Sequence, residues 1–201
     1  MYSRVLKRLL DIIISFLLIL ILLPFSFLIF LMIKIDSKGP LFFKQERVGQ
    51  DLKLFEVFKL RTMTDKERSV SKVIGRDKGV TRVGYYLRRF KIDELPQLIN
   101  VLKGEMSLVG PRPSIKEQLE DMSEKEKERY SVRPGMTGLA QVCGNIHISW
   151  KKRYKYDLKY VHNISFINDL KIILRTIQII IAGEEKFINK PLRIHETKKC
   201  L

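Results

Sequence analysis

The stretch that decides the fold is residues 93–104, with the sequence DELPQLINVLKG. Its leucines and its isoleucine recur at the i, i+3, i+4, i+7 spacing of one helix face. Asp93 occupies the position expected of an N-cap, and Gly104 is a typical C-terminal stop. The sequence therefore predicts an amphipathic helix that begins at Asp93 and ends at Gly104, with two adjacent carboxylates at its start.

Cations surround the Asp93-Glu94 pair along the chain. Arg88 precedes it, Lys59 lies in an earlier apolar stretch, and Arg112 follows between two prolines that restrict its backbone. A fixed guanidinium suits bidentate recognition of phosphate. An ionised carboxylate can bind magnesium or attack phosphorus. Each feature alone is also typical of a capped helix or a solvated surface, but their combination favours an enzyme that acts on a phosphorylated substrate.

An uncharged apolar segment, residues 12–33, lies near the N-terminus. Its 22 residues would form roughly 33 Å of helix, enough to cross a bilayer core of about 30 Å. Pro24 would bend such a helix, and basic residues flank both sides, with Lys7 and Arg8 before and Lys34 after. A spanning helix would place one basic flank on the far side, against the positive-inside tendency. The residues alone leave a spanning helix and a re-entrant helix equally open.

Composition limits the class of protein. With 201 residues and a formal net charge of +16, the chain fits one domain plus an anchor and favours polyanionic partners. Three classes of anionic partner are compatible with that positive charge: nucleic acid, anionic lipid headgroups and phosphorylated substrates. The two distant cysteines, Cys143 and Cys200, and the three scattered histidines argue against a disulfide framework and a zinc site.

Hydrophobic patterning predicts the first part of the remaining chain. Residues 41–48 and 53–60 are expected to form the two short strands of a hairpin. Residues 65–78 are polar and are expected to form a surface loop. Residues 81–90 carry apolar positions at helical spacing, with basic residues on the other side, and predict a short amphipathic helix.

The second part of the chain is predicted to be helical around one ordered loop. Residues 114–130 form a charged helix with a mostly solvated face, and the glycine-containing residues 133–145 form the loop. Residues 150–161 mix tyrosines with lysines and arginines. They either rest at the headgroup level of a membrane or pack their aromatic rings inward. Residues 167–182 are apolar but interrupted by charges, which indicates a core or interfacial helix rather than a spanning one.

Five stretches together resemble a known family. They are KRLLD (7–11), FKQERVG (43–49), FKLRTM (58–63), the run from Asp93 to Pro113, and RPGMTGLAQV (133–142). With these motifs the chain resembles the bacterial sugar transferases, the monotopic phosphoglycosyl transferases that start glycoconjugate assembly on a polyprenol carrier. Its short length is similar to that of the minimal members, such as the enzyme that starts N-linked protein glycosylation in some bacteria.

The resemblance implies a two-step reaction. Asp93 would attack the β-phosphate of a UDP-sugar and release UMP, and polyprenol (undecaprenyl) phosphate would then take the sugar-phosphate from Asp93. Glu94 would position the pair, assist proton transfer or help hold the metal. Arg112, Lys59 and Arg88 would bind phosphate oxygens, and Mg²⁺ would bind near Asp93. Expected partners are the UDP-sugar, the lipid, the bilayer and later glycosyltransferases of the pathway, but no nucleic acid.

The resemblance also implies how the chain meets the membrane. In small members the N-terminal helix is re-entrant, broken at a Ser-Pro pair, with a Lys-Arg pair at the cytoplasmic face. This sequence has Lys7, Arg8 and Pro24 but carries Leu23 in place of the serine, with Ser26 as a substitute. The family thus favours a monotopic protein on the cytoplasmic face of the bacterial inner membrane.

The expected architecture follows from these predictions. It is an α/β fold, mostly helical with a short β-hairpin. Residues 1–36 would form the re-entrant anchor, residues 37–183 a compact cytosolic catalytic domain with interfacial amphipathic helices, and residues 184–201 a polar tail.

The sequence departs from the family pattern at two positions in the glycine-containing loop, and two alternative functions are also considered. Cys143 and Asn145 replace an asparagine and an arginine of similar family members, so no sugar is predicted: UDP-linked N-acetylated sugars and UDP-galactose both stay open. The alternatives are a membrane-tethered basic module that binds nucleic acid or anionic lipid, and an inactive pathway scaffold. The intact Asp93-Glu94 pair argues against the scaffold.

Overall fold

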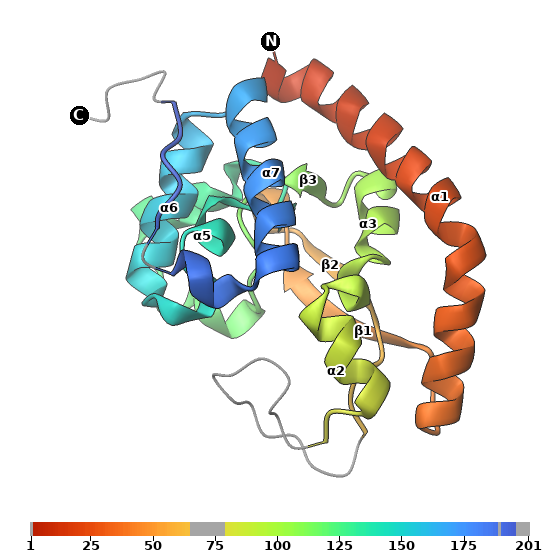
Figure 1. The fold of residues 1–201 in the computed structure, drawn as a ribbon. Coiled ribbons are helices and arrows are strands. Elements are labelled where there is room, and N and C mark those ends of the chain that lie inside the picture. Colours follow the sequence, from red (N-terminus) through yellow and green to blue (C-terminus); the bar gives the residue numbers. More distant parts are fainter. Residues whose placement is uncertain (1, 65–78, 189, 196–201) are drawn as a thin grey trace.

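The computed structural model describes residues 2–64, 79–188 and 190–195. It is mostly helical, with two small sheets and one long N-terminal helix that arches along one side of the molecule (Figure 1). The predicted polar loop at residues 65–78 lies outside the described residues, as does the end of the predicted tail from residue 196.

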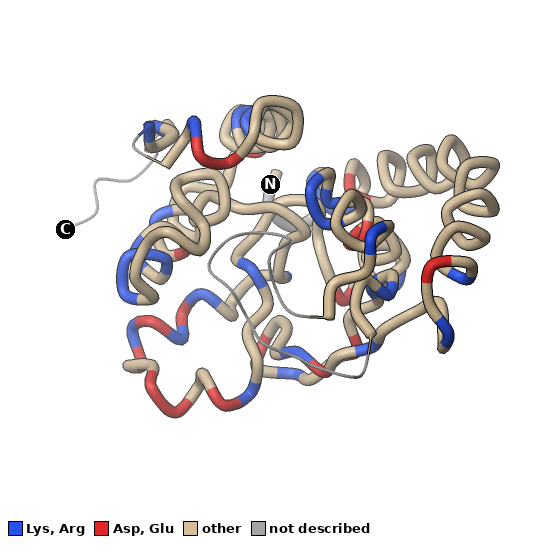
Figure 2. Tube along the Cα trace, turned by 60° about the horizontal axis from the view of Figure 1, so that its bottom comes forward, with Lys and Arg blue, Asp and Glu red and all other residues tan. Residues whose placement is uncertain are grey.

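The long helix is α1 (Lys7–Asp36), preceded by a π-helical turn, η1 (Tyr2–Leu6). Its most apolar window has a mean hydropathy of 3.1 and is only 6% buried, so α1 is long and apolar enough to cross a membrane. Figure 2 shows that charged residues are absent from its long middle part. The helix stays continuous through Pro24, and the hydroxyl of Ser26 donates to the Leu23 carbonyl at 2.6 Å. Pro24 therefore does not end the helix.

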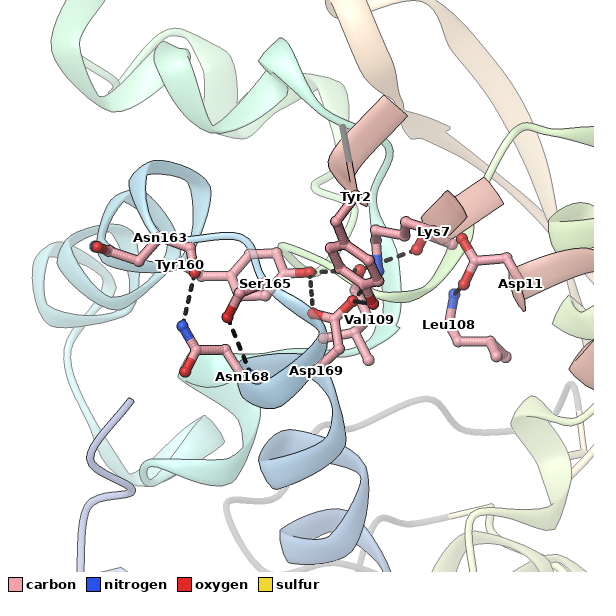
Figure 3. A network of polar contacts seen from close by, with 11 residues as sticks. Tyr2, Lys7, Asp11, Leu108, Val109, Tyr160, Asn163, Ser165, Asn168 and Asp169 are labelled. Carbon is pink, nitrogen blue, oxygen red and sulfur yellow. Dashed lines mark hydrogen bonds and ion pairs between the residues drawn. The ribbon is translucent and has the colours of Figure 1, made fainter. Parts of the chain in front are cut away.

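The start of α1 is held by a buried polar network (Figure 3). At its centre is Asp169 of α7 (Phe166–Ala182), which accepts Lys7 Nζ at 2.6 Å and the hydroxyls of Tyr2 and Tyr160 at 2.8 and 2.7 Å. Arg8 donates to two main-chain carbonyls in the last turn of α3 (Gln97–Lys103), where a cation also complements the helix dipole. The predicted anchor residues Lys7 and Arg8 thus bind α1 to the rest of the chain.

The end of α1 contacts the same body. Ile33 is 2% exposed and packs in a cluster with Leu60 and Leu87. Asp36 accepts the backbone N–H of Val83 at 2.8 Å, at the start of α2 (Arg82–Arg89). Both ends of the apolar helix are therefore fixed to one compact domain.

The predicted hairpin is confirmed. Strands β1 (Phe42–Val48) and β2 (Leu54–Leu60) are antiparallel, paired from Phe42–Leu60 to Val48–Leu54 around the short turn η2 (Gln50–Leu52). The helix predicted at residues 81–90 is also confirmed as α2, with Thr81 as its N-cap.

The helix predicted from Asp93 begins later than expected. Asp93 lies inside a three-residue 3-10 turn, η3 (Ile92–Glu94), and α3 starts only at Gln97, after Pro96. Pro96 has no N–H to offer, which is tolerated at a helix start. The N-cap prediction for Asp93 is therefore wrong, whereas Gly104, at φ 88°, ends the helix as predicted.

Residues 133–145 are more ordered than the predicted loop. They contain β4 (Gly135–Thr137), which runs parallel to β3 (Ser107–Val109), and the single turn α5 (Leu139–Val142). The two backbones approach so closely that a Cβ on Gly135 would lie 2.0 Å from the Gly110 nitrogen. Only glycine fits there, which explains why the chain has a glycine on both sides.

The predicted charged helix at residues 114–130 is broken into η4 (Lys116–Leu119), α4 (Glu124–Lys127) and η5 (Glu128–Ser131). Arg129 is 4% exposed, so the prediction of a mostly solvated face fails for this residue.

The last two predicted helices are confirmed as α6 (Trp150–His162) and α7. They enclose the largest described core cluster together with β3 and α5. The segment after η7 (Glu184–Phe187) returns along this core: Ile194 is buried, and the His195 N–H donates to Asn168 at 2.8 Å. The domain boundary at residue 183 remains a prediction.

Candidate active site

Asp93 is a buried carboxylate on a strained turn. The turn that carries Asp93 begins at Lys91, a non-glycine residue in the left-handed conformation at φ 58°. This conformation turns the chain sharply after α2. Asp93 is 8% exposed, and within the described residues nothing donates a hydrogen bond to its carboxylate. Burial and the neighbouring Glu94 raise the pKa of Asp93 to about 6. Asp93 is therefore ionised at neutral pH, more basic than an ordinary aspartate, and without a hydrogen-bond partner in the part of the chain that the structure describes.

Unlike Asp93, the Glu94 side chain is paired with two cations. It accepts Lys59 Nζ and Arg112 Nη2, both at 2.8 Å. Burial alone would raise the pKa of Glu94, but Arg112 and Lys59 outweigh burial and hold the pKa well below its ordinary value. Glu94 is thus a permanent carboxylate that orients two cations, rather than a proton carrier.

Each predicted cation reaches this site from a different element. Lys59 comes from β2, which Asn100 ties to α3 by accepting the Phe58 N–H and donating to the Glu56 carbonyl at 2.7 Å. Arg88 comes from α2, donates to Thr62 at 2.9 Å and contributes to the field at Asp93. The structure therefore brings Lys59, Arg88 and Arg112 close to the two carboxylates, and their binding of phosphate stays a prediction.

Arg112 is held by a buried ion pair that sequence analysis missed. Arg129 donates to the Arg112 carbonyl at 2.7 Å and to Asp157 of α6 through Nε and Nη2, at 3.0 and 2.7 Å. It also donates to the hydroxyl of Ser114. The side chains of Arg129 and Asp157 are only 4% and 3% exposed. Through the hydrogen bond of Arg129 to the Arg112 carbonyl, this ion pair holds the backbone of the Pro-Arg-Pro segment in place.

A basic cavity of about 200 Å³ opens beside Arg112. Arg47, Lys91 and Arg153 line it, and none of them forms an ion pair with a carboxylate of the described residues. Burial and the nearby Arg112 lower the pKa of Arg47 to about 10, so Arg47 stays charged among other cations. Trp150 is half exposed at the wall, with Arg153 stacked 4.1 Å from its ring centroid. The arrangement suits an anion that carries an aromatic ring.

Sequence analysis assigned no role to Arg47, Lys91 or Arg153. Arg47 lies within the FKQERVG motif, which was the available signal. The other two stand among many exposed basic residues, and nothing local distinguishes them.

A second cavity, of about 240 Å³, has mostly apolar walls and reaches the site from the side of α1 and α7. Glu94 is one of its few charged lining residues. Lys91, Gln141 and Asn145 line both this cavity and the basic one, so the two cavities are neighbours. Lys91, two residues before Asp93, lies at their shared wall.

A third cavity, of about 620 Å³, lies under the start of α1 and is lined by Lys7, Arg8 and Asp11. Lys7 is paired with Asp169, and Asp11 accepts the N–H of Leu108 at 3.1 Å. This cavity belongs to the attachment of α1, and no nucleophile of the candidate site faces it.

Asp93 is the carboxylate predicted to hold magnesium. The described residues contain no group of three or more His, Cys, Asp or Glu side chains placed to hold a metal. Mg²⁺ is commonly held by one or two carboxylates together with substrate phosphates, and the Asp93 carboxylate accepts no hydrogen bond from the described residues. The donor set thus fits a metal that arrives with a diphosphate.

Comparison with known proteins adds a family. Residues 2–183 match the family described as bacterial sugar transferase. The chain is 43% identical over 152 residues to the uncharacterized sugar transferase EpsL of Bacillus subtilis, covering 76% of this chain and 75% of the relative. It is 41% identical over 187 residues to the exopolysaccharide production protein PSS of Rhizobium leguminosarum, covering 86% and 94%.

A third relative carries a more specific name. The chain is 42% identical over 185 residues to a UDP-glucose:undecaprenyl-phosphate glucose-1-phosphate transferase of Klebsiella pneumoniae. The match covers 87% of this chain but only 40% of the relative, so this chain spans less than half of that protein.

Proposed function

The chain belongs to the bacterial sugar transferase family, and from that premise we propose that it transfers a sugar 1-phosphate from a UDP-sugar to undecaprenyl phosphate, releasing UMP. The observation that carries the proposal is Asp93: a buried carboxylate with a raised pKa, without a hydrogen-bond donor among the described residues, and next in sequence to Glu94, which lines the apolar cavity and binds Lys59 and Arg112. The name of the Klebsiella relative supports both substrates and makes UDP-glucose the first sugar nucleotide to test.

The first step uses Asp93 as the nucleophile. A carboxylate oxygen of Asp93 attacks the β-phosphorus, and the bond from that phosphorus to the bridging oxygen breaks. UMP leaves with the electron pair, and the sugar-phosphate stays on Asp93. Arg112, Lys59 and Arg88 stabilise the charge that shifts onto the phosphate oxygens. When bound, Mg²⁺ would be held by Asp93 and would neutralise part of the diphosphate charge.

The second step restores the enzyme. A phosphate oxygen of the lipid attacks the same phosphorus, the bond to Asp93 breaks, and the carboxylate returns with the electron pair. The product is polyprenol diphosphate sugar, the starting unit of a polysaccharide or glycoprotein glycan. Because each substrate reacts with Asp93 in turn, the kinetics should be ping-pong.

The decisive experiment separates these two steps. Detergent-solubilised protein is mixed with magnesium and a panel of UDP-sugars without lipid, and UMP and the mass of the protein are measured. One equivalent of UMP and a sugar-phosphate adduct on Asp93 are expected for the correct sugar. Turnover by an Asp93→Asn variant, or UMP release that needs the lipid from the start, would overturn the nucleophile assignment.

For the anchor, the proposal is a re-entrant helix on the cytoplasmic side of the inner membrane. A 30-residue helix is about 45 Å long, more than the roughly 30 Å of a bilayer core. Both of its ends contact the same domain, through Lys7 and Arg8 at one end and Ile33 and Asp36 at the other. A helix that crossed the bilayer would separate those two contacts by the membrane.

Cysteine accessibility tests this topology. In a background without Cys143 and Cys200, single cysteines replace Ser3 and Ser37 at the two ends of α1. Both should react with an impermeant reagent only from the cytoplasmic side. Periplasmic labelling at either position would rule out the re-entrant helix.

A further inference from the structure

The apolar cavity beside the active site has walls from three helices. The α7 wall is a stripe of Ile173, Thr176, Ile177 and Ile180, which share one helix face at i, i+3, i+4 and i+7. Leu18 of α1 stands opposite, one turn after Ile14. Leu95, which directly follows η3, and Leu98 of α3 also line the cavity.

The two outer walls continue into exposed apolar surface. Along α1, side chains such as Leu17 and Ile21 are 51% and 62% exposed, and along α7 Leu174 and Ile181 are 52% and 75% exposed. Exposed apolar surface of this extent indicates contact with lipid or another partner. Ile14, Leu18 and Ile177, which line the cavity, are themselves 38%, 37% and 47% exposed, so the α1 wall belongs to the part of the molecule with the strongest membrane character.

The lining of the cavity also includes charged residues. Lys91, Glu94 and Glu184 line it, and Glu94 is already paired with Lys59 and Arg112. Lys91 has no carboxylate partner within the described residues, and it also faces the basic cavity. A ligand that lies along this cavity would have its apolar part between α1 and α7 and its anionic end at Lys91, next to Asp93.

We propose that this cavity, named here the α1–α7 groove and lined by Ile14, Leu18, Leu95, Ile173, Ile177 and Ile180, binds the phosphate-proximal isoprene units of the lipid acceptor. The inference rests on the proposed function and locates its second substrate. A UDP-sugar is a poor occupant, because its hydroxyls would lose water without gaining partners from apolar walls. At about 240 Å³ the groove is small, so the rest of the lipid chain stays in the bilayer.

If the lipid lies in the groove, Lys91 is placed to contact its phosphate. Its left-handed backbone directs the chain so that one residue faces both cavities, and a lysine there can contact the acceptor phosphate as the lipid enters. Lys91 lines both cavities and its charge acts on Asp93, so the lipid phosphate approaches this carboxylate from the groove and the nucleotide approaches it from the basic cavity. Such an arrangement suits two substrates that must reach one carboxylate in succession.

The test uses substitutions that narrow the groove from its α1 wall or its α7 wall. Each groove variant is compared with a control variant at a nearby position that does not line the groove. Leu18→Trp and Ile177→Trp fill the groove, whereas Leu17→Trp and Ile181→Trp add the same ring to exposed positions that do not line it. Two quantities are measured: the single-turnover release of UMP without lipid, and kcat/KM for undecaprenyl phosphate.

We expect the groove variants to keep the UMP release of the wild type and to lose on the order of tenfold in kcat/KM for the lipid. The two control variants should match the wild type in both measurements. Equal lipid kinetics in groove and control variants would overturn the proposal. So would an equal loss in both steps by variants whose unfolding transition matches that of the wild type.

A second measurement needs no substitution. A polyprenyl phosphate with a photoreactive group on its first isoprene unit should label α7 between residues 173 and 180, or α1 near Leu18, in the wild-type protein. Labelling confined to other segments would overturn the groove. If the wild type released no UMP from any sugar nucleotide, the proposed function would fail, yet labelling would still report whether the groove takes the lipid.

Discussion

Replacing Asp93 with asparagine should make the protein more stable at neutral pH while abolishing its activity. Folding moves the Asp93 carboxyl into a site that is 8% exposed and raises its pKa from 3.8 to about 6. A rise of that size means that the ionised carboxylate destabilises the folded state by about 3 kcal/mol. A neutral asparagine of nearly the same shape removes this term.

The gain in stability should depend on pH with a definite sign. Below about pH 4 the carboxyl is protonated in both the folded and unfolded states, so the substitution changes little. Between about pH 4 and pH 6 the unfolded state releases its proton first, and the wild type loses stability as the pH rises. Above about pH 6 the difference between variant and wild type is fully developed.

Thermal unfolding in detergent measures this difference. At pH 7.5 the Asp93→Asn variant should melt about 6–12 °C above the wild type, and at pH 4 the two should coincide. The exposed Asp121 supplies a matched control, since Asp121→Asn should shift neither curve. An Asp93→Asn variant that melts below the wild type at pH 7.5, or that gains equally at pH 4, would refute the reasoning.

Three further predictions concern the supports of the site. Arg112→Ala should lower kcat by about 100-fold or more while the protein stays folded and membrane-bound; near-normal turnover would make Arg112 structural. Asp157→Asn should lower the free energy of unfolding by about 3–5 kcal/mol, because Arg129 would stay buried without its carboxylate; an unchanged denaturation midpoint would contradict this. Gly84→Ala should destabilise by about 1–3 kcal/mol, since its Cβ would lie 2.2 Å from the Thr62 carbonyl oxygen, and an unchanged midpoint would show that α2 can shift.

The sequence predicts those elements whose signals are local. The spacing of apolar residues correctly predicts α2, α3, α6 and α7, and alternation correctly predicts the β1–β2 hairpin. Each of these patterns repeats within a window of about 7–17 residues and is independent of what the element packs against. Asp93 and Glu94 are also visible from sequence, because two adjacent acids among basic residues are unusual in composition.

The remaining features depend on contacts between distant segments. Parallel pairing of β3 with β4 joins residues more than twenty positions apart, and neither three-residue strand has a pattern of its own. Arg129 sits in a run of charged residues, and only the position of Asp157 on α6 makes it a buried clamp. The cavities have the same origin: Lys91 and Arg153 line the basic one because of packing, with no signal in the residues around them.

The contrast between Asp93 and Glu94 explains why the site needs both acids. Two neighbouring carboxylates in one turn have pKa values shifted in opposite directions, upward for Asp93 and downward for Glu94. A free Asp93 surrounded by Lys59 and Arg112 would attract them, and an ion pair would lower its basicity and block its oxygen atoms. Glu94 binds both cations, so neither of them pairs with Asp93, and its negative charge raises the pKa of the Asp93 carboxyl. The same two cations stay close enough to bind an incoming diphosphate. Glu94, which forms no bond to the substrate, thus keeps Asp93 basic and available as the nucleophile.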